Sequence, residues 1–276
     1  MNSLSLPPSY PQHTKIFDGS RYIKRNPPSS KSSFKSLNRF KHHQHHQNQF
    51  SVLYKSITSP KMVLKLYGMR QATCTQRVLT TLSEKGIEFE LVVVNLRAGE
   101  QKEPSHLEKQ PFGKVPVLDD DGFLIYESRA ICKYLARKYA DKGTKLIPVE
   151  GDLKAYGLFE QACSLEQAYF DTETFGVWFE NAIKPRRGWG ATSEETVQKH
   201  LQTLDKNLAV YDQILSKQKY LAGDEFTLAD LFHLPHGTQA LKYGFQDLLG
   251  KYPHVNKWWE GLQARESWKE VVAGAA

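Results

Sequence analysis

The sequence predicts an α/β domain followed by an all-α domain, and three observations support this fold class. Residues 62–140 alternate short apolar runs with amphipathic segments and turn residues. Residues 151–276 show helical periodicity and no credible strand pattern. Residues 1–61 have neither periodicity and are rich in Ser, Pro, Asn, Lys and His, which favours disorder. We therefore expect a disordered basic extension (1–61) and two domains (62–140 and 151–276).

The first domain begins with a strand, a helix and a second strand. The run VLKLYG after Met62 predicts a short strand. Residues 75–85 then place their apolar side chains on one helical face before Gly86 ends the helix (Val78, Leu79 and Leu82). The next run, IEFELVVVN, alternates apolar residues at period two (Ile87, Phe89, Leu91 and Val93), which predicts a strand parallel to the first.

A hairpin and a helix complete this domain after the polar stretch of residues 97–110. Two apolar runs in KVPVLDDDGFLIYES flank residues 119–122, Asp-Asp-Asp-Gly, which is strong hairpin chemistry. The second run leads into a helix over residues 129–139, with Ser128 in the expected N-cap position and Ile131, Tyr134 and Leu135 facing inward. The order β-α-β, connection, β-β-α predicts a thioredoxin-like domain.

The second domain is expected to contain helices near residues 151–180, 193–216, 228–242 and 254–263. One boundary is well marked, because Thr227 and Asp230 are spaced to form a capping box before Leu231 and Phe232. Such a device satisfies free amides at the helix start. We expect it to stabilise the fold and to perform no chemistry.

The net charge of +7 does not indicate nucleic-acid binding by the folded part. Residues 1–61 hold ten Lys or Arg and one acid, Asp18, a charge of +9, so that residues 62–276 carry −2. No uncharged apolar run of about 18 residues is present, which predicts no membrane span. Cys74, Cys132 and Cys163 form no Cys-x-x-Cys or zinc-binding spacing. We expect no metal site, no nucleic-acid or membrane partner, and a reducing, cytoplasmic location.

Two interpretations of residues 1–61 stay open. The segment is basic, rich in Ser and nearly free of acids, as in organelle transit peptides, although it shows no Arg-rich amphipathic helix. A solvated low-complexity tail is the alternative. The same holds for its histidine tract, where metal binding is weighed against solvation and solvation is favoured (His42, His43, His45 and His46).

Three stretches, PFGKVPVL (111–118), YESRAICKYLA (126–136) and YLAGDEFTLADLFHLP (220–235), together resemble glutathione transferases, most closely the phi class and its fungal relatives. The resemblance covers residues 62–272. It implies the cytosolic glutathione transferase fold, with a thioredoxin-like and an all-helical domain, and a homodimer. It also implies an enzyme that conjugates the glutathione thiolate to electrophilic hydrophobic small molecules in detoxification, with glutathione as co-substrate and no cofactor.

The resemblance also implies a glutathione site. Val115, before Pro116, would pair its backbone with the ligand's cysteine, as a short added strand does. Glu127 and Ser128 at a helix start would meet the γ-glutamyl end. Lys102, with Gln101 and Lys114, would meet the glycyl carboxylate. Taken singly, these residues would instead be a strand residue, a helix cap and solvated surface side chains.

The catalytic position departs from the family pattern. Phi-class enzymes place a serine after the first strand, where its hydroxyl donates to the glutathione thiolate, and the motif YGMRQATCTQRVL has Ala72 there. Thr73 is the candidate replacement; its alternative role is a helix N-cap. Cys74 is a second candidate, for thiol-transfer chemistry, against a role as a buried small residue. Cys132 and Cys163 are interpreted as packing residues.

The candidate wall of the hydrophobic-substrate site consists of aromatic residues in the second domain, with Met69 and Arg70 in the loop beside Ala72 (Tyr169, Phe170, Phe175 and Trp178). Core packing explains these aromatic residues equally well. Other functions are weighed against conjugation: a non-catalytic ligandin that carries hydrophobic compounds, a glutathione-dependent thiol reductase or peroxidase, and a non-enzymatic transferase-like module. The first of these is motivated by Ala72.

Overall fold

The computed structural model describes residues 63–275. The predicted disordered extension, its histidine tract and its targeting interpretation lie outside these residues. The described residues belong to one compact unit, Ile57–Ala276. Contacts between the α/β domain and the helical domain are therefore part of the fold.

The first domain is built on a four-stranded sheet with the order β2-β1-β3-β4. Strand β1 (Leu64–Gly68) pairs in parallel with β2 (Phe89–Val93) and antiparallel with β3 (Val117–Asp120), which pairs antiparallel with β4 (Phe123–Tyr126). The predicted thioredoxin-like topology is confirmed. The predicted hairpin is confirmed too: Asp121 and Gly122 both have positive φ angles, 56° and 84°, as a two-residue type I′ turn requires.

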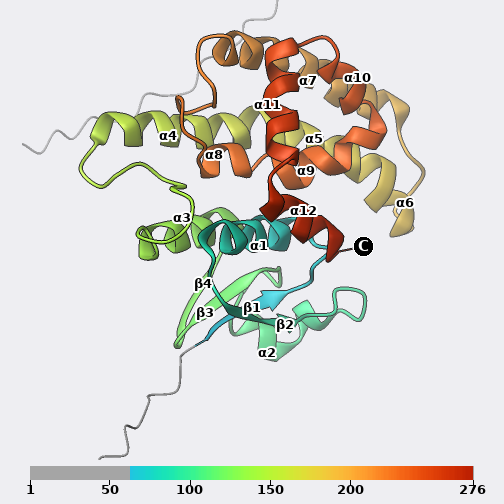
Figure 1. Cartoon of the computed structure of the whole chain (residues 1–276). Coiled ribbons are helices and arrows are strands. Elements are labelled where there is room, and N and C mark those ends of the chain that lie inside the picture. Colours follow the sequence, from blue (N-terminus) through green and yellow to red (C-terminus); the bar gives the residue numbers. More distant parts are fainter. Residues whose placement is uncertain (1–62, 276) are drawn as a thin grey trace, which may run out of the picture. The chain divides into compact units, whose positions relative to one another are not determined.

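Two helices cover the side of the sheet that faces the helical domain, while α2 (Pro104–Leu107) lies on the opposite side (Figure 1). These are α1 (Thr73–Lys85) and α3 (Ser128–Lys138). The expected apolar face of α1 is buried, and Gly86 ends this helix in the left-handed conformation. The short 3₁₀ turn η1 (Glu100–Lys102) precedes α2.

One local expectation in this domain is wrong. Ser128 is not the N-cap of α3, because Glu127 occupies that position and Ser128 is the first helical residue. The predicted parallel strand is observed as β2, and its last residue, Val93, is 66% exposed at the edge of the sheet. Of the alternating apolar residues, Ile87, Phe89 and Leu91 pack against the core, whereas Val93 does not.

The second domain is all-helical, as predicted. It begins with α4 (Leu153–Leu165), the π-helical segment η2 (Glu166–Asp171), α5 (Thr172–Trp178), a second π-helical segment η3 (Phe179–Ile183) and α6 (Lys184–Arg186). It continues with α7 (Glu194–Leu215), α8 (Leu228–Leu231), α9 (Leu234–Ala240), the 3₁₀ turn η4 (Leu241–Tyr243), α10 (Phe245–Leu249), α11 (Pro253–Gln263) and α12 (Glu266–Ala273).

The helix boundaries show where periodicity is an incomplete guide. The helices expected near 193–216 and 254–263 are observed as α7 and α11. The helix expected over 228–242 is divided into α8 and α9, with Pro235 in the first turn of α9, where its missing amide is tolerated. Helices α10 and α12 were not expected, because each is too short for periodicity to mark it.

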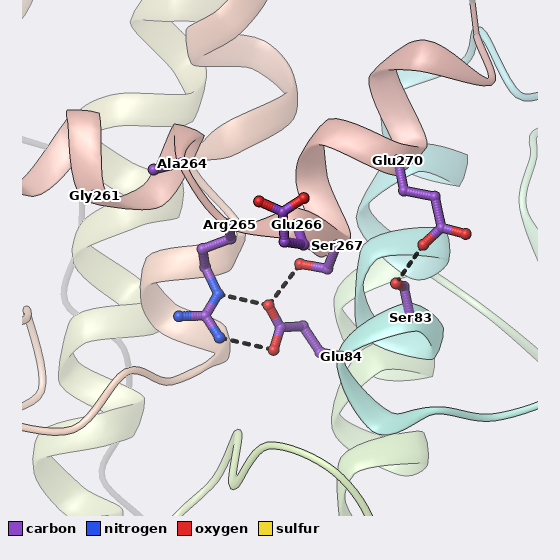
Figure 2. A pocket seen from close by; sticks show the side chains of 8 residues that line it. All are labelled: Ser83, Glu84, Gly261, Ala264, Arg265, Glu266, Ser267 and Glu270. Atoms are coloured by element: carbon purple, nitrogen blue, oxygen red, sulfur yellow. Dashed lines mark hydrogen bonds and ion pairs between the residues drawn. The ribbon is translucent and has the colours of Figure 1, made fainter.

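Helix α12 and the residues just before it are hydrogen-bonded to α1, and an open pocket of about 560 Å³ lies between them (Figure 2). Glu84 on α1 accepts hydrogen bonds from Arg265 Nε and Nη2 at 2.5 and 2.8 Å, and from the Ser267 hydroxyl at 2.5 Å. The Ser83 hydroxyl donates to Glu270 at 2.8 Å. These bonds hold the last described helix, α12, against the first domain.

Within residues 63–275, none of the helices combines the length and apolarity needed to cross a bilayer.

The predicted capping box is present and does more than cap α8. Asp230 is fully buried and accepts hydrogen bonds from the amides of Thr227 and Leu221 and from Trp258 Nε1 on α11. One carboxylate therefore joins α8 to the preceding loop and to α11. Each of its donors would lose a charged partner if this carboxylate were removed.

We expect Asp230→Ala to lower the free energy of unfolding by about 3 kcal/mol or more, because three buried donors lose their acceptor. Urea titration of the purified protein measures this change. Glu266→Ala is the control, since its side chain is 88% exposed and should change stability by less than about 0.5 kcal/mol. Equal stability of Asp230→Ala and wild type would show that the capping box is not structurally important.

Candidate active site

The sheet register brings three chain segments to one end of the sheet. Tyr67 pairs with Val117, and Val117 pairs with Tyr126. The end of β1, the start of β3 and the end of β4 therefore lie side by side. The loop into α1, the loop ending in the cis Val115–Pro116 peptide, and the start of α3 all emerge from this edge.

The N-terminus of α1 offers free amides. Ala72 occupies the N-cap position, and its methyl group cannot accept a hydrogen bond. Its own amide closes a turn onto the Met69 carbonyl, while its carbonyl accepts from Gln76. The amides of the first helical turn have no side-chain acceptor at the N-cap, and the helix dipole favours negative charge there. This end of α1 suits an anion such as a thiolate.

The Thr73 hydroxyl faces the helical domain. Its Oγ1 lies 2.8 Å from Nε2 of His236 on α9, and Nδ1 of His236 lies 2.6 Å from Oδ1 of Asp171 in η2. Both Thr73 and His236 are buried. The N-cap alternative for Thr73 is therefore wrong, because Ala72 holds that position and the hydroxyl engages a side chain of the other domain.

The start of α3 is a second place with unoccupied donors, since no described side chain caps it. Glu127 adopts a φ of 71°, which is uncommon for a residue with a Cβ and recurs at ligand-binding positions. The buried Ser128 hydroxyl accepts a hydrogen bond from Nη1 of Arg77 at 3.0 Å. Arg77 belongs to α1, so this bond connects the starts of the two helices.

The third group gathers around Gly113. Lys102 Nζ donates to the Phe112 carbonyl at 2.9 Å, and a Cβ at Gly113 would lie 2.7 Å from Lys102 Nζ and 2.8 Å from the Gln101 carbonyl. Gln101 Oε1 is buried without a hydrogen-bond partner among the described residues. Lys114 follows Gly113 directly. The structure thus brings Gln101, Lys102 and Lys114 together beside Val115.

Val115 itself has an available backbone. Within the described part of the chain, no backbone hydrogen bond outside the regular elements involves its amide or carbonyl. The neighbouring Lys114 carbonyl, by contrast, lies 2.7 Å from Nε2 of the buried His106. An extended peptide could therefore add to this edge through Val115, as in strand addition.

A buried charge cluster lies behind these helix starts. Arg129 on α3 donates from Nε and Nη2 to Glu166 at 2.8 and 2.7 Å, and its Nη2 lies 3.0 Å from Asp171. Arg77 lies 3.3 Å from Asp171 and 3.9 Å from Glu166. Arg77 also donates to the Phe232 carbonyl, and both guanidinium groups lie within 6 Å of the Phe232 ring.

The two carboxyl groups of this cluster respond differently to burial. Burial raises the pKa of Glu166 above its usual value, although Arg129 opposes this. Burial also acts against ionisation of Asp171, but the hydrogen bond from His236 and the charges of Arg77 and Arg129 outweigh it and lower the pKa of that carboxyl. Asp171 is therefore a carboxylate that accepts a hydrogen bond from the Nδ1–H of His236.

The π-helical geometry of η2 explains how both carboxylates reach the same arginines. In an α-helix, side chains five residues apart point about 140° away from each other. A π-turn closes between residues i and i+5, so that Glu166 and Asp171 share a face. Such turns occur often at functional sites.

An aromatic surface lies next to the Thr73–His236 pair. The ring of Phe175 lies 5.2 Å from that of His236 and 6.1 Å from Trp178, and Trp178 lies 5.9 Å from His236. Phe179 and the exposed Trp189 extend this surface. Phe175 is 39% exposed. The structure thus brings two of the predicted substrate-wall residues, Phe175 and Trp178, together beside the candidate thiolate site.

Other predicted wall residues lie elsewhere or have another role. Phe170 is 1% exposed and packs against Tyr211, Phe245 and Trp259, so the core-packing alternative holds for this residue. Tyr169 is exposed, and its carbonyl accepts from Asn207 on α7. Met69 is half-buried in the turn before Ala72, with the exposed Arg70 after it.

The cysteines differ in exposure. Burial raises the pKa of the Cys132 and Cys163 thiols to about 12, which supports their interpretation as packing residues. Cys74 is half-buried instead of buried, and Arg77 Nη1 lies 3.8 Å from its Sγ.

Five residues of this region were missed at the level of sequence: Arg77, Arg129, Glu166, Asp171 and His236. Arg77 is a long charged side chain on a helix whose neighbours Thr80 and Thr81 are also buried, so its burial was not apparent from apolar spacing. His236, in the stretch HLPHG, carried the clearest signal, because it is a titratable group in an otherwise apolar helix start.

Together, these features define a class of protein in which a thioredoxin-like domain with free, anion-binding helix starts is joined to an all-helical domain that supplies an aromatic wall. Comparison with known proteins agrees. The family profile described as glutathione S-transferase, N-terminal domain, matches residues 62–137, and that described as glutathione S-transferase, C-terminal domain, matches residues 121–266.

Individual relatives cover the same region. Glutathione S-transferase hmp2 from Hypomyces subiculosus is 51% identical over 214 residues, which are 78% of this chain and 100% of that protein. The crystal structure of glutathione transferase F7 from Populus trichocarpa is 39% identical, with a TM-score of 0.74, and is matched over 78% of this chain and 100% of that chain.

A third relative is glutathione S-transferase I from maize, solved in complex with an atrazine glutathione conjugate. It is 37% identical, has a TM-score of 0.71 and is matched over 77% of this chain and 98% of that chain. The chain belongs to the glutathione S-transferase family, and its relatives include phi-class (F) plant enzymes and a fungal transferase.

Proposed function

We propose that this protein conjugates the thiolate of glutathione to electrophilic, largely apolar small molecules, with glutathione as co-substrate and no further cofactor. The observation that carries the proposal is the meeting, at one end of the sheet, of the free start of α1, the loop of Val115 and the free start of α3. The maize relative solved with an atrazine glutathione conjugate supports it.

Each part of glutathione has a partner in this arrangement. The α3 start at Glu127 and Ser128 would receive the γ-glutamyl carboxylate, with Glu127 accepting from the α-ammonium. The Val115 backbone would pair with the cysteinyl residue. Lys102 and Lys114, with the amide nitrogen of Gln101, would donate to the glycyl carboxylate.

The thiol would then lie at the start of α1. A free thiol with a pKa of about 8.5 is only a few per cent ionised at neutral pH, so stabilisation of the thiolate raises the concentration of the nucleophile. The free amides of α1 and the Thr73 hydroxyl supply this stabilisation. Phe175 and Trp178 would hold the apolar electrophile beside the sulfur.

We also propose a role in detoxification in the cytoplasm; the aromatic wall, which would accept many apolar compounds, supports the detoxification role. A ligandin would use the same aromatic wall to bind apolar compounds, but it would not conjugate them to glutathione. The thiol-transfer alternative would depend on Cys74, which does not occupy the N-cap position at the start of α1.

We further propose that the protein is a homodimer. Exposed apolar side chains support this arrangement: Phe112 on the loop before β3 is 66% exposed, and the α4 residues Leu153, Tyr156 and Leu158 are also exposed. A second copy is the partner that the family resemblance implies.

The first test concerns the α1 start. We expect Thr73→Ala to lower the rate of conjugation to an aryl halide at neutral pH about ten-fold or more, because the thiolate loses a hydrogen bond worth roughly 1.5 to 3 kcal/mol. The deficit should shrink as the pH rises above the thiol pKa, where glutathione ionises without help. Ala72→Ser should gain little while Thr73 is present.

Thr203→Ala is the matched control, because the Thr203 hydroxyl is exposed on α7 and donates to the Lys199 carbonyl. Thr73→Ala with unchanged activity at every pH would contradict the hydroxyl account. Glutathione binding by calorimetry without wild-type turnover would favour the ligandin alternative instead.

The second test concerns assembly. Light scattering should give the wild type twice the chain mass of 31.6 kDa. Phe112→Ser should shift the protein toward the single-chain mass, because a large exposed apolar side chain is lost from the contact. Val93→Ser, an apolar position on β2 that is also 66% exposed, is the control. A wild-type mass of one chain would contradict the dimer.

A further inference from the structure

Thr73, His236 and Asp171 form a continuous hydrogen-bonded chain across the domain boundary. Thr73 Oγ1 lies 2.8 Å from His236 Nε2, and His236 Nδ1 lies 2.6 Å from Asp171 Oδ1. The chain joins α1, α9 and η2. The imidazole is buried and is held from the side by the rings of Phe175 and Trp178.

Proton counting along this chain assigns the donors. The Asp171 carboxylate can only accept, so Nδ1 of His236 carries a proton and donates it. In the neutral imidazole, Nε2 is then an acceptor, and the Thr73 hydroxyl donates its single proton to His236. In that state the Thr73 oxygen can accept from a thiol but cannot donate to a thiolate.

The charges around His236 determine when it can be protonated. Asp171 of η2 contacts the ring directly, and the positive charges of Arg77 on α1 and Arg129 on α3 oppose its protonation. Glu166 is paired with both arginines. The two guanidinium groups already face two carboxyl groups. Burial lowers the pKa of His236, although Asp171 opposes this, so the ring is neutral at pH 7 before a ligand binds. Protonation of the buried His236 imidazole would therefore require a new negative charge close to it.

We propose that His236 is a positioning residue that takes up the proton of the glutathione thiol through the Thr73 hydroxyl, while Asp171 holds the imidazole in place. The thiolate is the negative charge that accompanies the imidazolium. Position 72 has alanine and therefore no hydroxyl that could donate to the thiolate. After the proton transfer, the Thr73 hydroxyl supplies this hydrogen bond to the sulfur instead.

The step is balanced. The S–H bond breaks and its proton binds Thr73 Oγ1, while the original Thr73 hydroxyl proton moves to His236 Nε2. A neutral thiol and a neutral imidazole become a thiolate and an imidazolium, and Thr73 keeps one proton, now directed at the sulfur. After the thiolate has reacted, the imidazolium loses its proton to solvent.

The inference rests on the proposed function, since it needs glutathione with its thiol at the start of α1. The test counts protons. Calorimetry of glutathione binding in buffers of different ionisation enthalpy gives the protons released, and thiolate absorbance gives the thiolate formed. S-methylglutathione, which has no thiol proton, corrects for protons released by other groups.

In the wild type at pH 7 we expect nearly no proton release per thiolate, because His236 retains the proton. In His236→Gln, whose amide can bond to Thr73 but cannot take up a proton, the ratio should rise to about one proton per thiolate. Thr73→Ala, which removes the relay, should behave like His236→Gln. Thr73→Ser should keep the wild-type ratio.

His254→Gln is the matched control, because His254 also pairs with a carboxylate, Asp212, at 3.0 Å, but its side chain is exposed. It should leave the ratio unchanged. A wild-type ratio of about one, equal to that of His236→Gln and Thr73→Ala, would overturn the proposal even if conjugation is active. Glutathione binding without thiolate formation, or no binding, would instead contradict the proposed function.

Discussion

The site depends on a buried group of charges that spans the domain boundary. Arg77 on α1 and Arg129 on α3 both reach Asp171 and Glu166 of η2, and these groups have little exposure to water. Removing one charge would leave another buried without a partner, at a cost of several kcal/mol. The starts of α1 and α3 are therefore held in one position relative to the helical domain, and with them Thr73 and Ser128.

This arrangement divides the proposed chemistry between the two domains. The first domain supplies the groups that would bind glutathione, all near one end of the sheet. The second supplies the imidazole that contacts Thr73 and the aromatic wall of Phe175 and Trp178. Asp171 belongs to both systems, because it pairs with the arginines and also accepts from His236. The Asp171 carboxylate thus stabilises the domain boundary and also holds the imidazole that would take up the thiol proton.

Sequence alone predicted much of the fold, because strand alternation, the Asp-Gly turn and the Thr227–Asp230 capping box each depend on neighbouring residues. The family resemblance pointed to Val115 before Pro116 and to Glu127 at a helix start, where the structure has them. Gln101 and Lys102 were expected only in a polar stretch, and they lie in the 3₁₀ turn η1. The sequence did not predict the charge cluster. Glu166 and Asp171 share a face only because η2 is π-helical, and an α-helical period would separate them. The contact of Thr73 with His236 joins residues 163 positions apart, which no local pattern reveals.

The most direct test of this account is a crystal structure of the protein with glutathione bound. We expect the glutathione sulfur within hydrogen-bonding distance of Thr73 Oγ1, the cysteinyl backbone paired with Val115, and the γ-glutamyl carboxylate at the start of α3. Thr73 should still contact His236. A sulfur atom placed away from Thr73, against Cys74 or elsewhere, would contradict the account.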